Sequence, residues 1–175
     1  MTGCVGVCPR EQVQLDPISI GAIGDDEFVA RGAFYPSHTD KAGKVTNQLF
    51  KKSDLLQGTG SVWRVAPVGR FLDELIPELE ASRPNNPLKK VLAVKVGKIR
   101  GLMLAAGGRE FSVVDECDSD INGGKHPAHA HIAICKAAIA GVAGIEDPIV
   151  IQAHRDLLLL FRNGAVWESL QLKAA

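Results

Sequence analysis

The amino-acid sequence predicts a single α+β domain in which a mainly antiparallel sheet is flanked by two or three helices. Segments that alternate apolar and polar residues occur in pairs suited to hairpins, and these pairs outnumber any regular alternation of strands and helices. The two kinds of segment do not alternate regularly, as a parallel sheet would require. A chain of 175 residues, 46% hydrophobic and 23% charged, fits one compact domain. We expect this domain over residues 17–175, after a flexible N-terminal segment at residues 1–16.

The first elements of the domain are two predicted strands separated by a long connection. Residues 27–34 alternate as in a half-buried strand, and residues 61–65 do so again. Residues 35–44 are polar and rich in turn formers, which predicts a loop. Residues 45–56 show no clean period, so we expect irregular structure or a short helix there.

The middle of the chain predicts a helix and then an ambiguous basic segment. Residues 68–81 carry apolar side chains at helical spacing, and we expect Pro77 to kink or shorten this helix. Residues 83–87 contain two prolines and predict a loop. Residues 88–106 fit either a strand or a helix. This segment has five cations and no acid between positions 89 and 100. It fits a solvated face better than a nucleic-acid surface, because no aromatic side chains are interleaved.

A hairpin is predicted in the second half of the chain. Residues 111–115 and 128–134 have strand patterns, and a turn over residues 118–125, around Asn122-Gly123-Gly124, joins them. Side chains two apart on a strand share a face, so we expect Ala130, Ile132 and Ile134 to pack into the core.

The C-terminal part predicts a helix over residues 148–162. Asp147 suits the N-cap and Pro148 the first helical position, while Asn163-Gly164 is typical of a helix stop. The alternative is a hairpin, in which residues 157–161 form one strand and a type I′ turn at Asn163-Gly164 leads into the next.

Composition excludes some classes of function. Twenty basic residues balance twenty acidic ones, so the chain has no strong nucleic-acid signal and no global attraction to an anionic membrane. No apolar run is long enough to span a bilayer and no signal peptide is evident, which favours a cytoplasmic protein. The sequence contains no phosphate-cradling glycine motif, no nucleophile elbow and no dinucleotide fingerprint.

The cysteines stand at positions 4, 8, 117 and 135. We expect free thiols, because four cysteines are few for this length and no secretory signal indicates an oxidising compartment. Cys4 and Cys8 are either loosely ordered thiols or part of a zinc site with Cys117 and a histidine.

The strongest candidate for a catalytic or metal-binding site is a cluster of histidines beside an acidic segment. Three of the five histidines, His126, His129 and His131, fall within six positions, shortly after Asp115 and Cys117. Strand parity puts His129 and His131 side by side on the face opposite the core. Asp115 and Cys117 have matching parity on the partner strand and are expected across from them, if the register allows it.

This cluster has two chemical uses and one inert interpretation. In the first use, His129 and His131 bind a divalent metal with Asp115, Cys117 or His126, zinc being the default, and an open position activates water. In the second, one histidine is a general base and another a general acid, and Arg31 or Arg64 stabilises an anionic transition state. The inert interpretation is a pair of solvated histidines on an exposed strand.

The loop after the first strand is a second candidate site. Arg31, Tyr35, Ser37 and His38 combine a cation for anion binding, two hydroxyls and a titratable ring at a strand end. The alternative is a hydrophilic turn in which Ser37 and Asp40 bond their own backbone.

From these residues we expect a metal-dependent hydrolase that acts on a phosphorylated or nucleotide-like small molecule through His126, His129 and His131, with Arg31 assisting. The alternative is a noncatalytic adaptor whose apolar helices dock on a protein partner or on a second copy of the chain. Under both hypotheses, substitution of His129 or His131 by Ala is expected to change stability by less than about 0.5 kcal/mol, and only the enzyme or metal hypothesis expects a loss of ligand binding.

Overall fold

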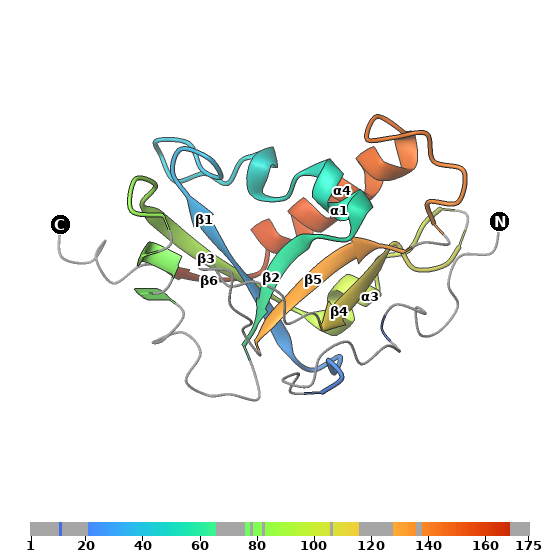
Figure 1. Cartoon of the computed structure of the whole chain (residues 1–175), viewed down its shortest axis with the longest axis horizontal. Coiled ribbons are helices and arrows are strands. Elements are labelled where there is room, and N and C mark those ends of the chain that lie inside the picture. The colour runs from blue at the N-terminus through green and yellow to red at the C-terminus, as the bar shows by residue number, and fades with distance from the viewer. Residues whose placement is uncertain are drawn as a thin grey trace.

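The computed structural model describes residues 11, 21–65, 76–77, 79–81, 83–105, 107–115, 128–135 and 138–168. Its strands form one six-stranded sheet in the order β4-β5-β2-β1-β3-β6 (Figure 1). All pairings in this sheet are antiparallel, which confirms the expected α+β fold. The strands are β1 (Phe28–Phe34), β2 (Gly60–Arg64), β3 (Leu88–Lys95), β4 (Phe111–Asp115), β5 (His129–Ile134) and β6 (Ala165–Glu168).

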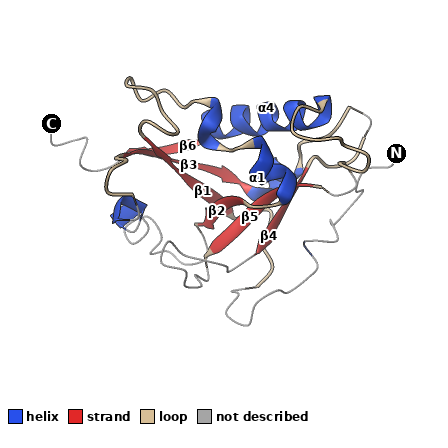
Figure 2. Cartoon of the chain, turned by 45° about the horizontal axis from the view of Figure 1, so that its top comes forward, coloured by secondary structure: helices blue, strands red, loops and turns tan. Residues whose placement is uncertain are grey.

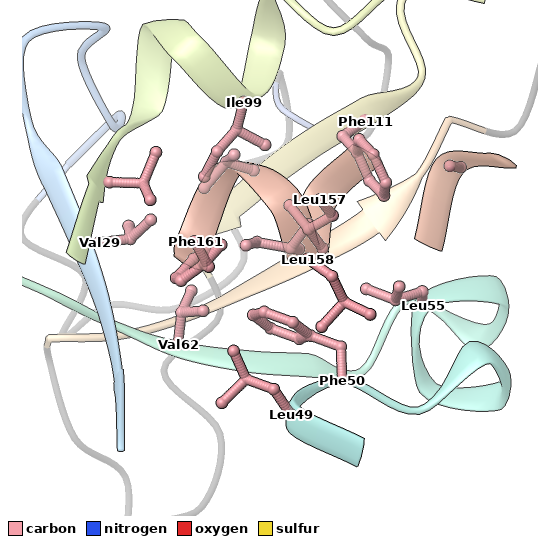
Figure 3. Packing of buried hydrophobic residues seen from close by; sticks show 14 of the residues in the cluster. Val29, Leu49, Phe50, Leu55, Val62, Ile99, Phe111, Leu157, Leu158 and Phe161 are labelled. Carbon is pink, nitrogen blue, oxygen red and sulfur yellow. The ribbon is translucent and has the colours of Figure 1, made fainter. Parts of the chain in front are cut away.

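Helices α1 and α4 cover one face of the sheet (Figure 2). The helical elements are η2 (Asn47–Leu49), α1 (Lys52–Gln57), α3 (Val96–Arg100) and α4 (Pro148–Arg162). The main core lies between α4 and the sheet, where Leu157, Leu158 and Phe161 pack among side chains from β2 and α1 (Figure 3). The rings of Phe50 and Phe161 meet edge to face, with centroids 4.9 Å apart.

The C-terminal helix forms as its caps predict, and the hairpin alternative for this segment is wrong. The side chain of Asp147 accepts a hydrogen bond from the backbone N–H of Ile149 at 2.9 Å, and Pro148 occupies the first turn. The chain then continues into β6, which pairs with β3 rather than with residues 157–161.

The basic segment over residues 88–106, which fits either a strand or a helix, forms first a strand and then a short helix. Residues Leu88–Lys95 form a strand and Val96–Arg100 a short helix. The predicted connection over residues 45–56 contains η2 and α1, as expected. Of the predicted helix at 68–81, residues 76–77 and 79–81 are helical. The rest of that helix, the turn at 118–125 and most of the segment at 1–16 lie outside the described residues.

A second apolar cluster buries the other face of the sheet. It consists of Ala30, Phe34, Trp63, Leu79, Leu88, Val91, Ala93 and Ala128. All six residues of β5 are therefore buried, whichever face they point to. Among the described helices, none combines the length and the hydrophobicity that a membrane span requires.

Candidate active site

The histidines of β5 share one face with two residues of β2. His129 is paired with Trp63 and His131 with Ser61, and residues directly paired across a ladder point to the same side of the sheet. His129 and His131 are only 4% and 8% exposed. The expectation of solvated histidines on an exposed strand is therefore wrong, because the second apolar cluster covers this face as well.

Ser61 and His129 form a hydroxyl and imidazole pair on this face. Ser61 Oγ lies 2.6 Å from Nε2 of His129. The ring of His131 meets that of His129 edge to face, with centroids 4.7 Å apart, and Trp63 meets His129 in the same way at 5.2 Å. His129 is thus held between two rings, and its Nε2 is directed at the serine.

This arrangement has the geometry of a nucleophile and its base. A serine oxygen within hydrogen-bond distance of an imidazole nitrogen can lose its proton to that nitrogen as it attacks an electrophile. Ser61 is half-buried, whereas the imidazole behind it is buried. Sequence reasoning missed Ser61, because its partner is 68 positions away and belongs to a strand that is not adjacent in the chain.

The register of β4 and β5 separates Asp115 from the histidines. Asp115 is paired with Ala130, and Val114 is paired with His131. Asp115 therefore points to the opposite face, where Nη1 of Arg64 lies 3.3 Å from its carboxylate. The expected placement of Asp115 across from the histidines is wrong by one residue of register, which turns its side chain to the other face.

The side chain of Arg64 is hydrogen-bonded to structural partners on the face opposite the histidines. Its guanidinium donates to both carboxylate oxygens of Glu27 at 2.9–3.0 Å and to the carbonyl of Gly21 at 2.7 Å. The side chain is 2% exposed. A buried guanidinium tied to two carboxylates contributes to structure, and it is not directed at the histidine face.

Arg31 occupies the place where β1 and β2 separate. The ladder between these strands ends at Ala30 and Trp63. Beyond it, Nη1 of Arg31 donates to the carbonyl of Ser61, and Nε donates to the carbonyl of Leu49 at 2.6 Å. The guanidinium packs over the ring of Phe50 at 4.6 Å, on the helix-covered face. Arg31 thus contacts the backbone of the serine from the side opposite its hydroxyl.

Arg31 and His38 both have shifted pKa values. Burial, and then the charge of Arg83, lower the pKa of Arg31 to about 10, so it is still a cation at neutral pH. Burial, and then the charge of Arg31, lower the pKa of His38 to about 4. His38 is neutral in the folded protein, with Nδ1 at 3.2 Å from the carbonyl of Gly32, to which it donates.

The proposed metal site has two of its ligands together. His129 and His131 are adjacent, Asp115 is on the other face, and Cys117 and His126 lie outside the described residues. Cys4 and Cys8 lie outside them too. Within the described ranges, no three His, Cys, Asp or Glu side chains are grouped closely enough to hold a metal ion. Zinc binding stays a prediction that residues beyond these ranges would have to complete.

Comparisons with protein-family models, with curated proteins and with solved structures find no match for this chain.

Proposed function

We propose that the protein is a hydrolase in which Ser61 is the nucleophile and His129 its general base. The observation that carries this proposal is the 2.6 Å contact between Ser61 Oγ and Nε2 of His129. The contact joins the hydroxyl of a half-buried serine to the imidazole of a buried histidine. Ser61 is therefore the more accessible of the two residues, as a nucleophile in front of its base would be.

The substrate class that we propose is a phosphate ester, in keeping with the phosphorylated or nucleotide-like molecule expected from the sequence. Ser61 Oγ forms a bond to phosphorus as the bond from phosphorus to the leaving oxygen breaks. The serine proton moves to Nε2 of His129, and the leaving oxygen, on the far side of phosphorus, takes a proton from solvent water. In a second step water attacks phosphorus from the side that the leaving group vacated and releases a proton to solvent. The bond from phosphorus to Ser61 Oγ breaks, His129 returns its proton to Oγ, and the phosphate product leaves.

The two histidines are less suited to act as a separate acid and base. Attacking and leaving oxygens lie on opposite sides of phosphorus during in-line transfer. The rings of His129 and His131 are in contact, with centroids 4.7 Å apart, so a phosphoryl group does not fit between them. We therefore assign His131 a positioning role, in which its ring fixes the orientation of His129.

Kinetic measurements test the nucleophile. We expect the wild type to hydrolyse p-nitrophenyl phosphate or bis(p-nitrophenyl) phosphate, and Ser61→Ala to reduce kcat by about 100-fold or more. Ser53→Ala is the control, because Ser53 lies on α1 and bonds Asp54 at 3.1 Å. Full activity in Ser61→Ala would contradict the proposal. Hydrolysis of p-nitrophenyl acetate alone would contradict the phosphate substrate.

The same assay tests the metal dependence expected from the sequence. If His129 and His131 hold zinc, a chelator removes activity and added zinc restores it. If Ser61 and His129 act alone, the chelator leaves kcat unchanged. Elemental analysis of wild type beside a His129→Ala/His131→Ala double variant measures metal content independently of turnover.

The adaptor alternative has less support. Large apolar side chains that are exposed among the described residues are Met103, Ile145, Ile151, Leu159 and Val166. Ile151 and Leu159 lie eight residues apart on α4, with the exposed Arg155 between them. Isolated apolar side chains are ordinary on protein surfaces and do not make a docking face. If the wild type has no hydrolytic activity, the noncatalytic adaptor becomes the favoured hypothesis.

A further inference from the structure

A cluster of cations surrounds His38 at the end of β1. Besides burial, three positive charges lower the pKa of this histidine: Arg31, Arg83 and Lys51. Arg83 also lowers the pKa of Arg31, and the carboxylate of Asp54 partly offsets that effect. Positive charge is therefore concentrated around a neutral imidazole.

Phe34 holds two members of this cluster in place. The guanidinium of Arg83 lies over the ring of Phe34, 4.9 Å from its centroid, and the ring of His38 meets Phe34 edge to face at 5.8 Å. Phe34 belongs to the same apolar cluster as Trp63, whose ring contacts His129. Arg83 and His38 are thus attached to the face of the sheet that carries Ser61 and His129.

The cluster is also next to Ser61 along the strands. The β1–β2 ladder ends at Ala30 and Trp63, so Gly32 and Ser61, each two residues further on, flank the point where the strands separate. His38 bonds the carbonyl of Gly32, and Arg31 bonds the carbonyl of Ser61. Arg31 and His38 therefore approach the same end of the β1–β2 ladder as Ser61, Arg31 from the helix-covered face and His38 from the face that carries the Ser61 hydroxyl.

Several polar groups of this region lack a partner. Thr39 is 1% exposed, and its hydroxyl, like the buried hydroxyl of Ser37, makes no hydrogen bond within the described structure. Arg31 and Arg83 contact carbonyls and aromatic rings, and neither is within ion-pair distance of a carboxylate among the residues described. Buried hydroxyls without partners are rare and indicate a ligand or a water that is to be bound.

We propose that Arg83, Ser37 and Thr39, grouped around His38, bind the phosphate group of the substrate, while the buried Arg31 adds positive charge from the helix-covered face of the sheet. Guanidinium groups match the oxygens of phosphate in geometry and charge, and hydroxyls donate to the oxygens that remain. An anion bound here lies near the end of the β1–β2 ladder, where Gly32 and Ser61 follow the last paired residues. The substrate identity rests on the proposed hydrolase function, whereas phosphate binding is measurable without turnover.

Binding of inorganic phosphate, followed by calorimetry at constant ionic strength, tests the site. We expect Arg83→Gln to weaken phosphate binding at least fivefold, because it removes one cation at an exposed position. Arg155→Gln is the matched control: its side chain is 72% exposed on α4, and phosphate affinity is expected to stay unchanged. No binding to the wild type, or equal affinity in Arg83→Gln, would overturn the proposal.

Two variants separate this inference from the hydrolase proposal. Ser61→Ala is expected to lose turnover and to bind phosphate as the wild type does. Arg83→Gln is expected to raise KM for a phosphate ester with a smaller change in kcat. Turnover that survives in Ser61→Ala while phosphate still binds would refute the hydrolase mechanism alone. Turnover that needs Ser61 but has an unchanged KM in Arg83→Gln would refute the phosphate site alone.

Discussion

Ser61 and His129 meet diagonally across the β2–β5 ladder, although each is directly paired with another residue. Ser61 is paired with His131 and His129 with Trp63, yet Ser61 Oγ bonds Nε2 of His129 at 2.6 Å. Diagonal neighbours on one face are within reach when one side chain is long, as imidazole is. The direct partner, His131, then packs its ring against that of His129.

Substitution of His131 is expected to destabilise the fold. The residue is 8% exposed and packs against His129, so His131→Ala removes ring packing from a buried face. We expect a loss of about 1–3 kcal/mol in the free energy of unfolding, measured by urea denaturation. Lys41→Ala, an exposed loop control, is expected to change it by less than about 0.5 kcal/mol. Equal stability of His131→Ala and wild type would mean that this face is open to water.

Asp115 is expected to matter for stability and not for hydrolysis. Its carboxylate lies 3.3 Å from Nη1 of Arg64, on the face opposite Ser61. Asp115→Asn weakens a buried ion pair, and we expect a loss of about 1–3 kcal/mol, with kcat within about twofold of wild type for the folded protein. Thermal unfolding and steady-state kinetics measure the two effects. A large fall in kcat at unchanged stability would restore Asp115 to the site as a metal ligand.

Glu110 is expected to make the protein less stable as the pH rises from 4.5 to 7. Burial, and then the negative charge of Asp156, raise the pKa of Glu110 from 4.5 to about 7, and one carboxylate oxygen has no hydrogen-bond partner within the described residues. Below pH 4.5 the carboxyl is protonated in both states. Between pH 4.5 and pH 7 the unfolded chain releases the proton of Glu110 and the folded protein keeps it. The free energy of unfolding therefore falls over this range, by up to about 3 kcal/mol.

The isosteric variant Glu110→Gln isolates this effect. It cannot ionise, so the fall in unfolding free energy between pH 4.5 and 7 should be absent in urea titrations of the variant. Asp156→Asn removes the second cause of the pKa shift and is expected to reduce the fall without abolishing it. If the free energy of unfolding has the same pH dependence in wild type and Glu110→Gln, the pKa of Glu110 is not raised by folding and the prediction is wrong.

The pKa of His38 is expected to lie well below that of an ordinary histidine. Burial, with the charges of Arg31, Arg83 and Lys51, lowers its pKa from 6.5 to about 4. Its contribution to stability is present above pH 6.5 and is lost as the pH falls toward 4, because the unfolded chain takes up the proton first. NMR titration of the ring protons measures the pKa directly. A midpoint near 6.5 would mean that His38 faces water rather than Phe34 and the cations.

The elements that local patterns govern were predictable. The α4 helix is confirmed over residues 148–162 because Asp147 and Pro148 start it by contacts within one turn. The strand predicted over residues 128–134 is confirmed over residues 129–134, because alternation separates Ala130 and Ile132 from the histidines. These features depend on neighbours in the sequence.

The site was only partly predictable, because it depends on contacts between distant segments. Strand parity correctly put His129 and His131 on one face. The placement of Ser61 beside them depends on the pairing of β2 with β5, which no local pattern specifies. A shift of one residue in the β4–β5 register decides that Asp115 faces Arg64. Burial of the histidine face results from a second cluster assembled from several strands.

Covalent trapping of Ser61 tests the central proposal most directly. A fluorophosphonate would be attacked by Ser61 Oγ with loss of fluoride and transfer of the serine proton to His129, and peptide mass spectrometry locates the adduct. We predict an adduct on Ser61 that forms at least about tenfold more slowly in His129→Gln, with folding of each variant checked by circular dichroism. An unmodified Ser61, or equal labelling in the folded His129→Gln variant, would contradict the assignment of Ser61 and His129 as nucleophile and base.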